Sequence, residues 1–193
     1  MKSTLLLKLW LILLVCCFTA CRNSSSSIEG ASPTVEPVSS SAPPVKVYLV
    51  RHAEKDISNP SDEDPGLTPQ GQHRAEALQA LLEGQEVDAL YATKYQRTKN
   101  TLKPLADARQ LEIRQYEAHD FKGLKQQLLE NHSGETVVVA GHSNTLLPII
   151  EALGAKRPVP DVSDAQYDYL FTVTVTPEGT ATVETDHYGT ANR

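Results

Sequence analysis

The order of apolar and polar residues divides the chain into three parts of different character. Apolar residues dominate the first twenty positions, Ser and Pro crowd the stretch that follows, and apolar and polar segments alternate from residue 45 onward. The alternating part has 149 residues, which is enough for one domain with a hydrophobic core. The pattern predicts a leader over residues 1–20, a flexible tether over residues 21–44 and a folded domain over residues 45–193.

Segments typical of strands and helices alternate along residues 45–193. Runs of β-branched and apolar residues predict strands, and apolar residues at helical spacing predict helices. The predicted strands cover residues 45–50, 87–91, 111–116, 136–140, 169–176 and 180–187, and the predicted helices cover residues 68–82, 95–108, 121–131 and 146–153. This order predicts an α/β fold with a mostly parallel central sheet, helices on both of its faces and a C-terminal β-hairpin.

The first twenty residues have the layout of a secretory signal peptide. Lys2 gives a positive start, and the uninterrupted apolar run after Lys8 has 12 residues, whereas a membrane-spanning helix needs about 20. The sequence FTAC at residues 18–21 resembles a bacterial lipobox, in which the Cys is lipidated and becomes the new N-terminus. We expect an exported protein that a lipid on Cys21 anchors to a bacterial membrane, facing the periplasm or on the outer membrane if the cell has two. An uncleaved anchor and an ordinary cleaved signal peptide are the alternatives.

Cysteine usage and charge narrow the chemistry of the domain. All three Cys residues lie within the first 21 positions, so the domain is expected to hold neither a disulfide nor a thiolate metal site. Without residues 1–21 the chain keeps 16 basic and 24 acidic residues, a net charge of −8. Nucleic acid is not an expected partner, because binding its backbone needs a basic face. An anion site would have to be built from a few local cations.

Two of the predicted strands end in residues suited to catalysis. The strand over residues 45–50 runs into Arg51 and His52, and the strand over residues 136–140 runs into Gly141, His142 and Ser143. Ligands of open α/β sheets bind beyond the carboxyl ends of the strands. The sequence therefore predicts that the active site lies at this edge of the sheet.

Four short motifs follow one another at these strand ends and helix starts. They are LVRHAE at residues 49–54, LTPQG at residues 67–71, YATKYQRT at residues 91–98 and AGHS at residues 140–143. In this order they resemble the motifs of the histidine phosphatase superfamily, in its phosphoglycerate mutase-like branch. The resemblance implies a domain of the small phosphatase type, with a fold that agrees with the predicted order of elements.

The chemistry of phosphoryl transfer gives four of these residues a role. His52 is the predicted nucleophile, because a neutral imidazole can attack phosphorus and form a phosphohistidine. Arg51 and Arg97 carry planar forks that match phosphate oxygens, and His142 is the predicted charged donor to a developing oxyanion. The resemblance implies the same roles. We expect a small phosphorylated substrate, no metal and no other cofactor, since two guanidinium groups would repel a cation held by the two histidines and Glu54.

The proton donor to the leaving group is less clearly marked. The resemblance places a carboxylate in the loop after the third strand, where the chain offers Glu117 and Asp120. We favour Glu117, which comes first after the strand, because Asp120 could instead cap the helix that follows. Glu54, beside the nucleophile, is a third candidate. If none of them faces the pocket, substrates with good leaving groups, such as phosphoramidates or acyl phosphates, are favoured.

These features predict an exported, metal-independent phosphohydrolase that cleaves phosphomonoesters or phosphoramidates through a phosphohistidine on His52. A phosphate-binding or scaffold lipoprotein without turnover is the first alternative, and a phosphoglycerate-type mutase is a weaker one. A serine hydrolase is disfavoured, because Thr145 stands where the nucleophile-elbow motif needs Gly. No motif includes the other four histidines, which we expect at the surface or in the core: His73, His119, His132 and His187.

Overall fold

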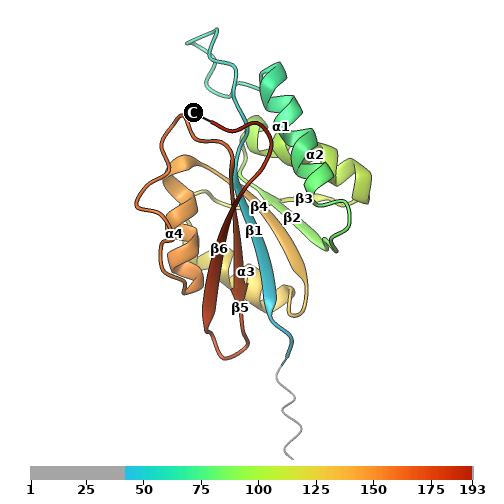
Figure 1. Cartoon of the computed structure of the whole chain (residues 1–193), viewed down its shortest axis with the longest axis vertical. Helices are drawn as coiled ribbons and strands as arrows, with labels where there is room; N and C mark the ends of the chain where they lie inside the picture. Colours follow the sequence, from blue (N-terminus) through green and yellow to red (C-terminus); the bar gives the residue numbers. More distant parts are fainter. Residues whose placement is uncertain (1–41, 193) are drawn as a thin grey trace, which may run out of the picture. The chain divides into compact units, whose positions relative to one another are not determined.

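The structure is a computed structural model in which residues 42–192 are described, so the predicted signal peptide, Cys21 and most of the predicted tether lie outside the described residues. Six strands and four helices form the described part (Figure 1). The strands are β1 (Val45–Arg51), β2 (Ala89–Ala92), β3 (Ile113–Gln115), β4 (Thr136–Gly141), β5 (Tyr169–Val175) and β6 (Ala181–His187). The helices are α1 (Pro69–Leu81), α2 (Gln96–Arg109), α3 (Phe121–Asn131) and α4 (Ser143–Leu153). Across residues 42–192, no helix has both the length and the apolar character needed to cross a membrane.

The strands form one six-stranded sheet in the order β3-β2-β4-β1-β5-β6. The pairs among β3, β2, β4 and β1 are parallel, whereas β5 runs antiparallel to both β1 and β6. The predicted fold class is therefore confirmed, including the C-terminal hairpin. In the central pair, β1 and β4, Arg51 lies opposite Gly141, so the ends of two predicted motifs are neighbours.

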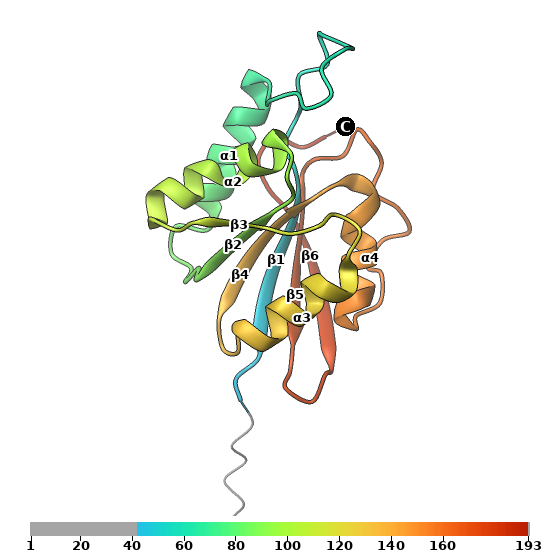
Figure 2. The same ribbon diagram turned by 180° about the vertical axis from the view of Figure 1, so that it is seen from behind.

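Side chains of the central strands pack alternately on the two faces of the sheet, because successive residues of a strand point to opposite sides. In β1, Val47 and Leu49 belong to a core that α3 and α4 complete, whereas Tyr48 and Val50 belong to a core that α1 and α2 complete. Figures 1 and 2 show the two helix pairs from the two sides of the molecule. Burial on both faces explains why β1 and β4 are almost continuously apolar.

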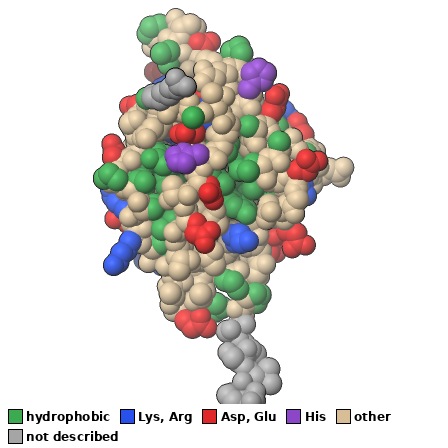
Figure 3. Space-filling model, viewed as in Figure 1, with side chains coloured by type: hydrophobic (Ala, Val, Ile, Leu, Met, Phe, Trp, Pro, Cys, Tyr) green, Lys and Arg blue, Asp and Glu red, His purple; other side chains and the backbone are tan. Residues whose placement is uncertain are grey.

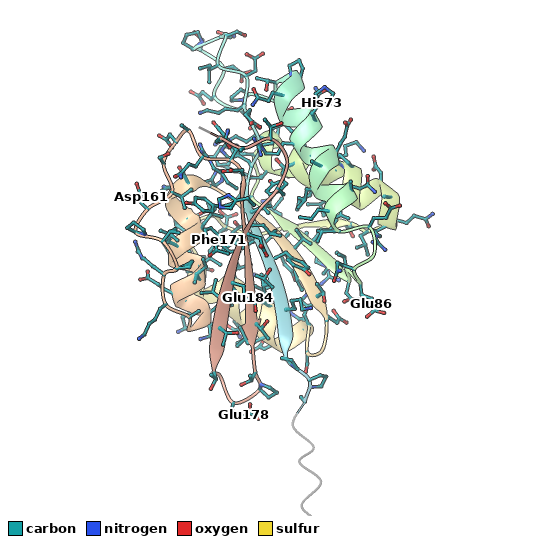
Figure 4. All side chains as sticks on the ribbon, in the orientation of Figure 1. His73, Glu86, Asp161, Phe171, Glu178 and Glu184 are labelled. Atoms are coloured by element: carbon teal, nitrogen blue, oxygen red, sulfur yellow. The ribbon has the colours of Figure 1, made fainter. Side chains whose placement is uncertain are left out.

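The hairpin at the sheet edge has one buried and one polar face. Phe171 of β5 is fully buried, and Thr172 beside it points to the opposite face, where its partner on β6 is Glu184. Figure 4 shows Glu178 at the tip of the hairpin and Glu184 on β6. Acidic and His side chains are scattered over this side of the molecule in Figure 3. A charged edge strand of this kind discourages pairing with the edge of another sheet.

Three element starts differ from the prediction by two residues or more, and one of these differences affects the site. β2 begins at residue 89 instead of 87, and β3 has only three residues, because it pairs with β2 over that length alone. α4 begins at Ser143, three residues before the predicted start. Thr145 Oγ1 accepts the backbone N–H of His142 at 2.9 Å and closes the first turn. The N-terminus of α4, which carries partial positive charge, therefore lies directly at the end of β4.

Candidate active site

His52 and His142 leave the sheet at neighbouring positions of its carboxyl edge, which is the upper end of the sheet in Figure 1. The backbone N–H of His52 donates to the carbonyl of Gly141 at 2.9 Å. The centroids of the two imidazole rings are 5.4 Å apart, with the ring planes at 64°. Arg51 ends β1, and Arg97 reaches the same edge from the first turn of α2. The structure thus brings the four motif residues together.

A cavity of about 300 Å³ opens between these side chains. It is lined by Arg51, His52, Lys55, Tyr95, Arg97, Ala118, His119, His142, Ser143, Asn144 and Asp164. Three Lys or Arg side chains face a single carboxylate there, although acidic residues outnumber basic ones in the chain as a whole. A local excess of cations on an acidic protein concentrates the field at the pocket and attracts anions to it.

His52 is held as a neutral imidazole with one nitrogen free. Its Nδ1 lies 2.8 Å from the carbonyl oxygen of Ala53, and since a carbonyl only accepts, Nδ1 carries the proton and Nε2 carries the lone pair. Burial, aided by the charge of Arg51, lowers the pKa of His52 to about 3. At neutral pH the ring is therefore uncharged and has the tautomer that an attacking Nε2 requires.

Arg51 is fixed by the loop that precedes β5. Its NH1 donates to the carbonyls of Ser163, Asp164 and Gln166 at 2.9–3.0 Å. Its guanidinium carbon lies 4.0 Å from the centroid of the Tyr167 ring. These contacts leave Nε of Arg51 buried and without a hydrogen-bond partner among residues 42–192. A guanidinium fixed in this way presents its positive charge at the cavity wall, where it attracts an oxyanion.

Like Arg51, Arg97 packs against an aromatic ring and has an Nε that is unpaired among the described residues. Its guanidinium lies 4.1 Å from the centroid of the Tyr95 ring, and its Nε is also buried with no partner in the described part of the chain. The carboxylate of Asp64 lies 3.7 Å from NH1 of Arg97 and accepts the N–H of Gln96 at 2.9 Å. Both guanidinium groups line the cavity, Arg51 from β1 and Arg97 from α2, and each has an Nε with no partner among residues 42–192.

His142 is uncharged beside these arginines. Burial, together with the charges of Arg97 and Arg51, lowers the pKa of His142 to about 4. Thr93 Oγ1 lies 3.0 Å from its Nε2 and holds the ring in place. The sequence predicts a charged donor at this position, and with these neighbours the ring is neutral at pH 7. A phosphate dianion would offset the two guanidinium charges and so raise the pKa of His142.

None of the three predicted proton donors lines the cavity. The carboxylate of Glu54 turns to α1, where Arg74 donates to it at 2.8–3.1 Å. Asp120 accepts the N–H of Gly123 at 2.8 Å and caps α3, which is the alternative the sequence offered for it. Glu117 lines an adjoining cavity instead. Within residues 42–192 no three His, Cys, Asp or Glu side chains are arranged to hold a metal ion.

The cavity also contains residues that the motifs do not mark. His119, expected at the surface or in the core, lies on the pocket wall in the same loop as Glu117. Asp164 comes from the loop between α4 and β5, and its carboxylate accepts from Ser143 Oγ at 2.8 Å. The predicted loop position could have identified His119, because it stands two residues after the favoured acid. Nothing in the sequence marks Asp164, since the course of its loop depends on tertiary contacts.

Two guanidinium groups and a neutral imidazole at the carboxyl edge of a parallel sheet are groups suited to bind and attack a phosphoryl group. Residues 47–119 match the family described as the histidine phosphatase superfamily (branch 1). This match confirms the resemblance drawn from the motifs. Among curated proteins, none matches the chain.

Solved structures of the same fold agree with this assignment. The protein histidine phosphatase SixA complexed with tungstate is 18% identical, with a TM-score of 0.61, over 74% of this chain and 96% of that one. YhfR of Bacillus stearothermophilus is 20% identical, with a TM-score of 0.59, over 72% of this chain and 95% of that one. Phosphoglycerate mutase from Bacillus anthracis is 14% identical, with a TM-score of 0.57, over 76% of this chain and 94% of that one. At these identities the likeness concerns the fold.

Proposed function

We propose that the chain is a phosphohydrolase that acts through a phosphohistidine on His52 and needs no metal. The observation that carries this proposal is a neutral imidazole, with its Nδ1 proton fixed on the Ala53 carbonyl at 2.8 Å, in a pocket that the side chains of Arg51 and Arg97 also line. Such a site supplies a nucleophile and preorganised positive charge for the oxygens of the transferred group.

The reaction has two steps. In the first, Nε2 of His52 attacks phosphorus, the Nε2–P bond forms, and the bond from phosphorus to the leaving oxygen or nitrogen breaks. In the second, water attacks phosphorus and loses a proton to solvent, the electrons of the Nε2–P bond return to the imidazole, and phosphate carries away the oxygen of the water. Arg51 and Arg97 are suited to hold the equatorial oxygens in both steps, and His142 to donate to one of them.

The surroundings of the leaving group favour phosphoramidates over simple phosphomonoesters. An alkoxide needs a proton from the protein as it leaves, and none of Glu54, Glu117 and Asp120 lines the cavity. Among the described residues, the one carboxylate on the cavity wall, that of Asp164, accepts from Ser143 Oγ at 2.8 Å and lies 3.6 Å from the guanidinium of Arg51, which favours its ionised form. A nitrogen leaving group can take its proton from solvent before the P–N bond breaks, so it does not depend on such a donor. The name of one structural relative, a protein histidine phosphatase, supports the same substrate class.

The test is phosphate release by the purified full-length chain from a phosphoramidate and from p-nitrophenyl phosphate, with EDTA present. His52→Ala is expected to abolish turnover of both, and a ³²P label from substrate should appear on wild type as acid-labile phosphohistidine. His73→Ala removes an exposed histidine of α1 and should leave turnover unchanged. Full turnover by His52→Ala, or loss of turnover with EDTA, would contradict the proposal.

A binding role without turnover is the second candidate. The observation behind it is that the cavity lacks the predicted acid, although it keeps both arginines and both histidines. Tungstate binding in calorimetry without turnover of any phosphoramidate or ester would favour this role. Interconversion of phosphoglycerates, with no net release of phosphate, would instead indicate a mutase.

Export and lipid anchoring remain proposals from the sequence. They rest on the charged start, the 12-residue apolar run and the FTAC sequence that ends at Cys21. Expressed in a bacterium, the chain should incorporate radiolabelled palmitate and sediment with membranes. Cys21→Ser should remove the label, and a labelled Cys21→Ser chain would contradict lipidation at this residue.

A further inference from the structure

A buried guanidinium outside the pocket joins three parts of the chain. The side chain of Arg74, on α1, is 1% exposed. Its Nε and NH2 donate to the carboxylate of Glu54 at 2.8–3.1 Å. Its NH1 donates to the carbonyl of Tyr188 at 2.9 Å, and its NH2 donates to the carbonyl of Thr190 at 2.8 Å. Arg74 thus connects the C-terminal segment to the residues that directly follow His52.

The backbone of Glu54 is held from the same helix. Its carbonyl accepts the N–H of Thr68 at 2.9 Å and the hydroxyl of Thr68 at 3.3 Å. A Cβ on Gly71 would collide with the carbonyl oxygen of Glu54, so the first turn of α1 sits directly on this peptide. Both the side chain and the backbone of Glu54 therefore depend on where α1 lies.

The position of Glu54 affects the orientation of the His52 imidazole through a single peptide unit. The peptide between Ala53 and Glu54 contains the carbonyl that accepts the Nδ1 proton of His52 at 2.8 Å. On the other side of Ala53, its N–H donates to Thr101 Oγ1 at 2.8 Å. Thr101 fixes one end of this short segment and Arg74 fixes the other, through Glu54. A rotation of the Glu54 backbone would turn the Ala53 carbonyl away from the imidazole.

The C-terminal segment extends the connection to the phosphate-binding side. Oδ1 of Asn192 accepts the N–H of Tyr167 at 2.8 Å and lies 3.3 Å from NH2 of Arg74. The ring of Tyr167 lies against the guanidinium of Arg51 and 6.0 Å, centroid to centroid, from the ring of His52. Arg74 therefore touches both of the segments that orient the site, although it does not line the cavity.

We infer that Arg74 is a positioning residue, which holds Glu54 so that the Ala53 carbonyl keeps His52 in the tautomer with a free Nε2. This inference rests on the proposed function. Arg74 is suited to the task because its rigid fork satisfies a carboxylate and two backbone carbonyls at once, which the single ammonium of Lys does not do. An imidazole whose other nitrogen loses its partner can shift to the second tautomer, and then its Nε2 cannot attack.

The first test compares Arg74→Lys with a matched variant. Arg109 also donates to two backbone carbonyls, those of Leu82 and Gln85, but does not line the cavity. We expect Arg74→Lys to lower kcat about 10–100-fold, by analogy with the loss of an outer partner that orients a metal-bound histidine, with KM changed much less. Arg109→Lys should leave kcat unchanged even where both variants lower Tm equally. Wild-type kcat in a folded Arg74→Lys protein would overturn the inference.

The second test measures the tautomer of His52 directly. In ¹⁵N spectra of the imidazoles, wild-type His52 should carry its proton on Nδ1, and Arg74→Lys should show a growing Nε2–H population. If removing the cation prevents folding, the double variant Glu54→Gln/Arg74→Gln removes both buried charges together and should show the same shift. An unchanged tautomer in a folded variant would overturn the inference. The spectra need no turnover, so they judge the inference separately from the proposed function.

Discussion

The guanidinium carbon of Arg51 lies over the ring of Tyr167, 4.0 Å from the ring centroid. This contact joins the loop before β5 to the last residue of β1, 116 positions earlier in the sequence. In the described part of the chain, residues 42–192, the nearest acidic partner of Arg51 is Asp164, at 3.6 Å. The aromatic face and three carbonyls therefore hold a buried cation that would otherwise need a counter-ion.

The contact predicts a specific loss in anion affinity. Tyr167→Ala should weaken tungstate binding about 2–30-fold, since a cation–π contact contributes about 0.5–2 kcal/mol. Tyr167→Phe keeps the ring and should bind tungstate nearly as well as wild type. Calorimetry on the two variants measures the difference. Equal affinity for Tyr167→Ala and wild type would show that the carbonyls alone orient Arg51.

Arg97→Lys should lower kcat/KM about 10–100-fold. Lys keeps the charge but loses the fork, and a hydrogen bond to a charged group contributes about 1.5–3 kcal/mol. Steady-state kinetics on a phosphoramidate measure the effect. Arg157→Lys, at an exposed residue that pairs with Glu151, is the control and should match wild type. A kcat/KM for Arg97→Lys within twofold of wild type would contradict its predicted role.

The two site histidines predict a stability that falls in acid. Burial first, and nearby arginines next, lower the pKa of His52 to about 3 and that of His142 to about 4, whereas an unfolded His titrates near 6.5. As pH falls below about 6.5 the unfolded chain takes up protons that the folded chain refuses, so stability falls until the folded pKa is reached. Each histidine contributes a slope of up to about 1.4 kcal/mol per pH unit.

Urea unfolding of wild type and of His52→Gln between pH 7 and pH 4.5 checks this slope. The variant should lose less stability than wild type over the same interval, because one of the two titrating rings is gone. His73→Gln, at the exposed face of α1, should keep the wild-type slope. Parallel curves for wild type and His52→Gln would contradict the lowered pKa.

Gly71→Ala should destabilise the fold by about 1–3 kcal/mol, the usual cost of forcing atoms into a packed contact. The added Cβ would meet the backbone of Glu54, which cannot yield without moving the segment after His52. Gly84→Ala is the matched control, since nothing lies within 4 Å of a Cβ at that position. Thermal unfolding of the two variants should separate them clearly. A smaller loss of Tm in Gly71→Ala than in Gly84→Ala would be inconsistent with the structure.

Local patterns in the sequence were enough to predict the sheet, its helices and the meeting of His52 with His142. β1 and β4 are apolar on both faces, and their motifs fall at the strand ends, so neither feature depends on distant contacts. The start of α4 was missed because Thr145, which closes its first turn through the N–H of His142, also fits a loop.

Features built from residues far apart in the sequence could not be predicted in the same way. The carboxylate of Glu54 looked like a candidate acid because it follows His52 so closely, yet its partner Arg74 stands 20 positions later on α1. Whether a Glu faces a pocket or a buried Arg depends on how α1 packs. The loop that brings Asp164 and Tyr167 to Arg51 has no periodicity at all, and its path is set by hydrogen bonds to the cation.

The direction of β1 determines how the domain can be held. The chain enters the sheet at Val45, and six residues later the same strand delivers Arg51 to the pocket, so entry and pocket lie about 20 Å apart at opposite ends of one strand. A support or fusion partner attached ahead of residue 42 would hold the domain at the start of β1, at the end of the sheet opposite the cavity. When the domain is immobilised through this attachment point, the entrance of the cavity should stay accessible to large phosphorylated molecules as well as small ones.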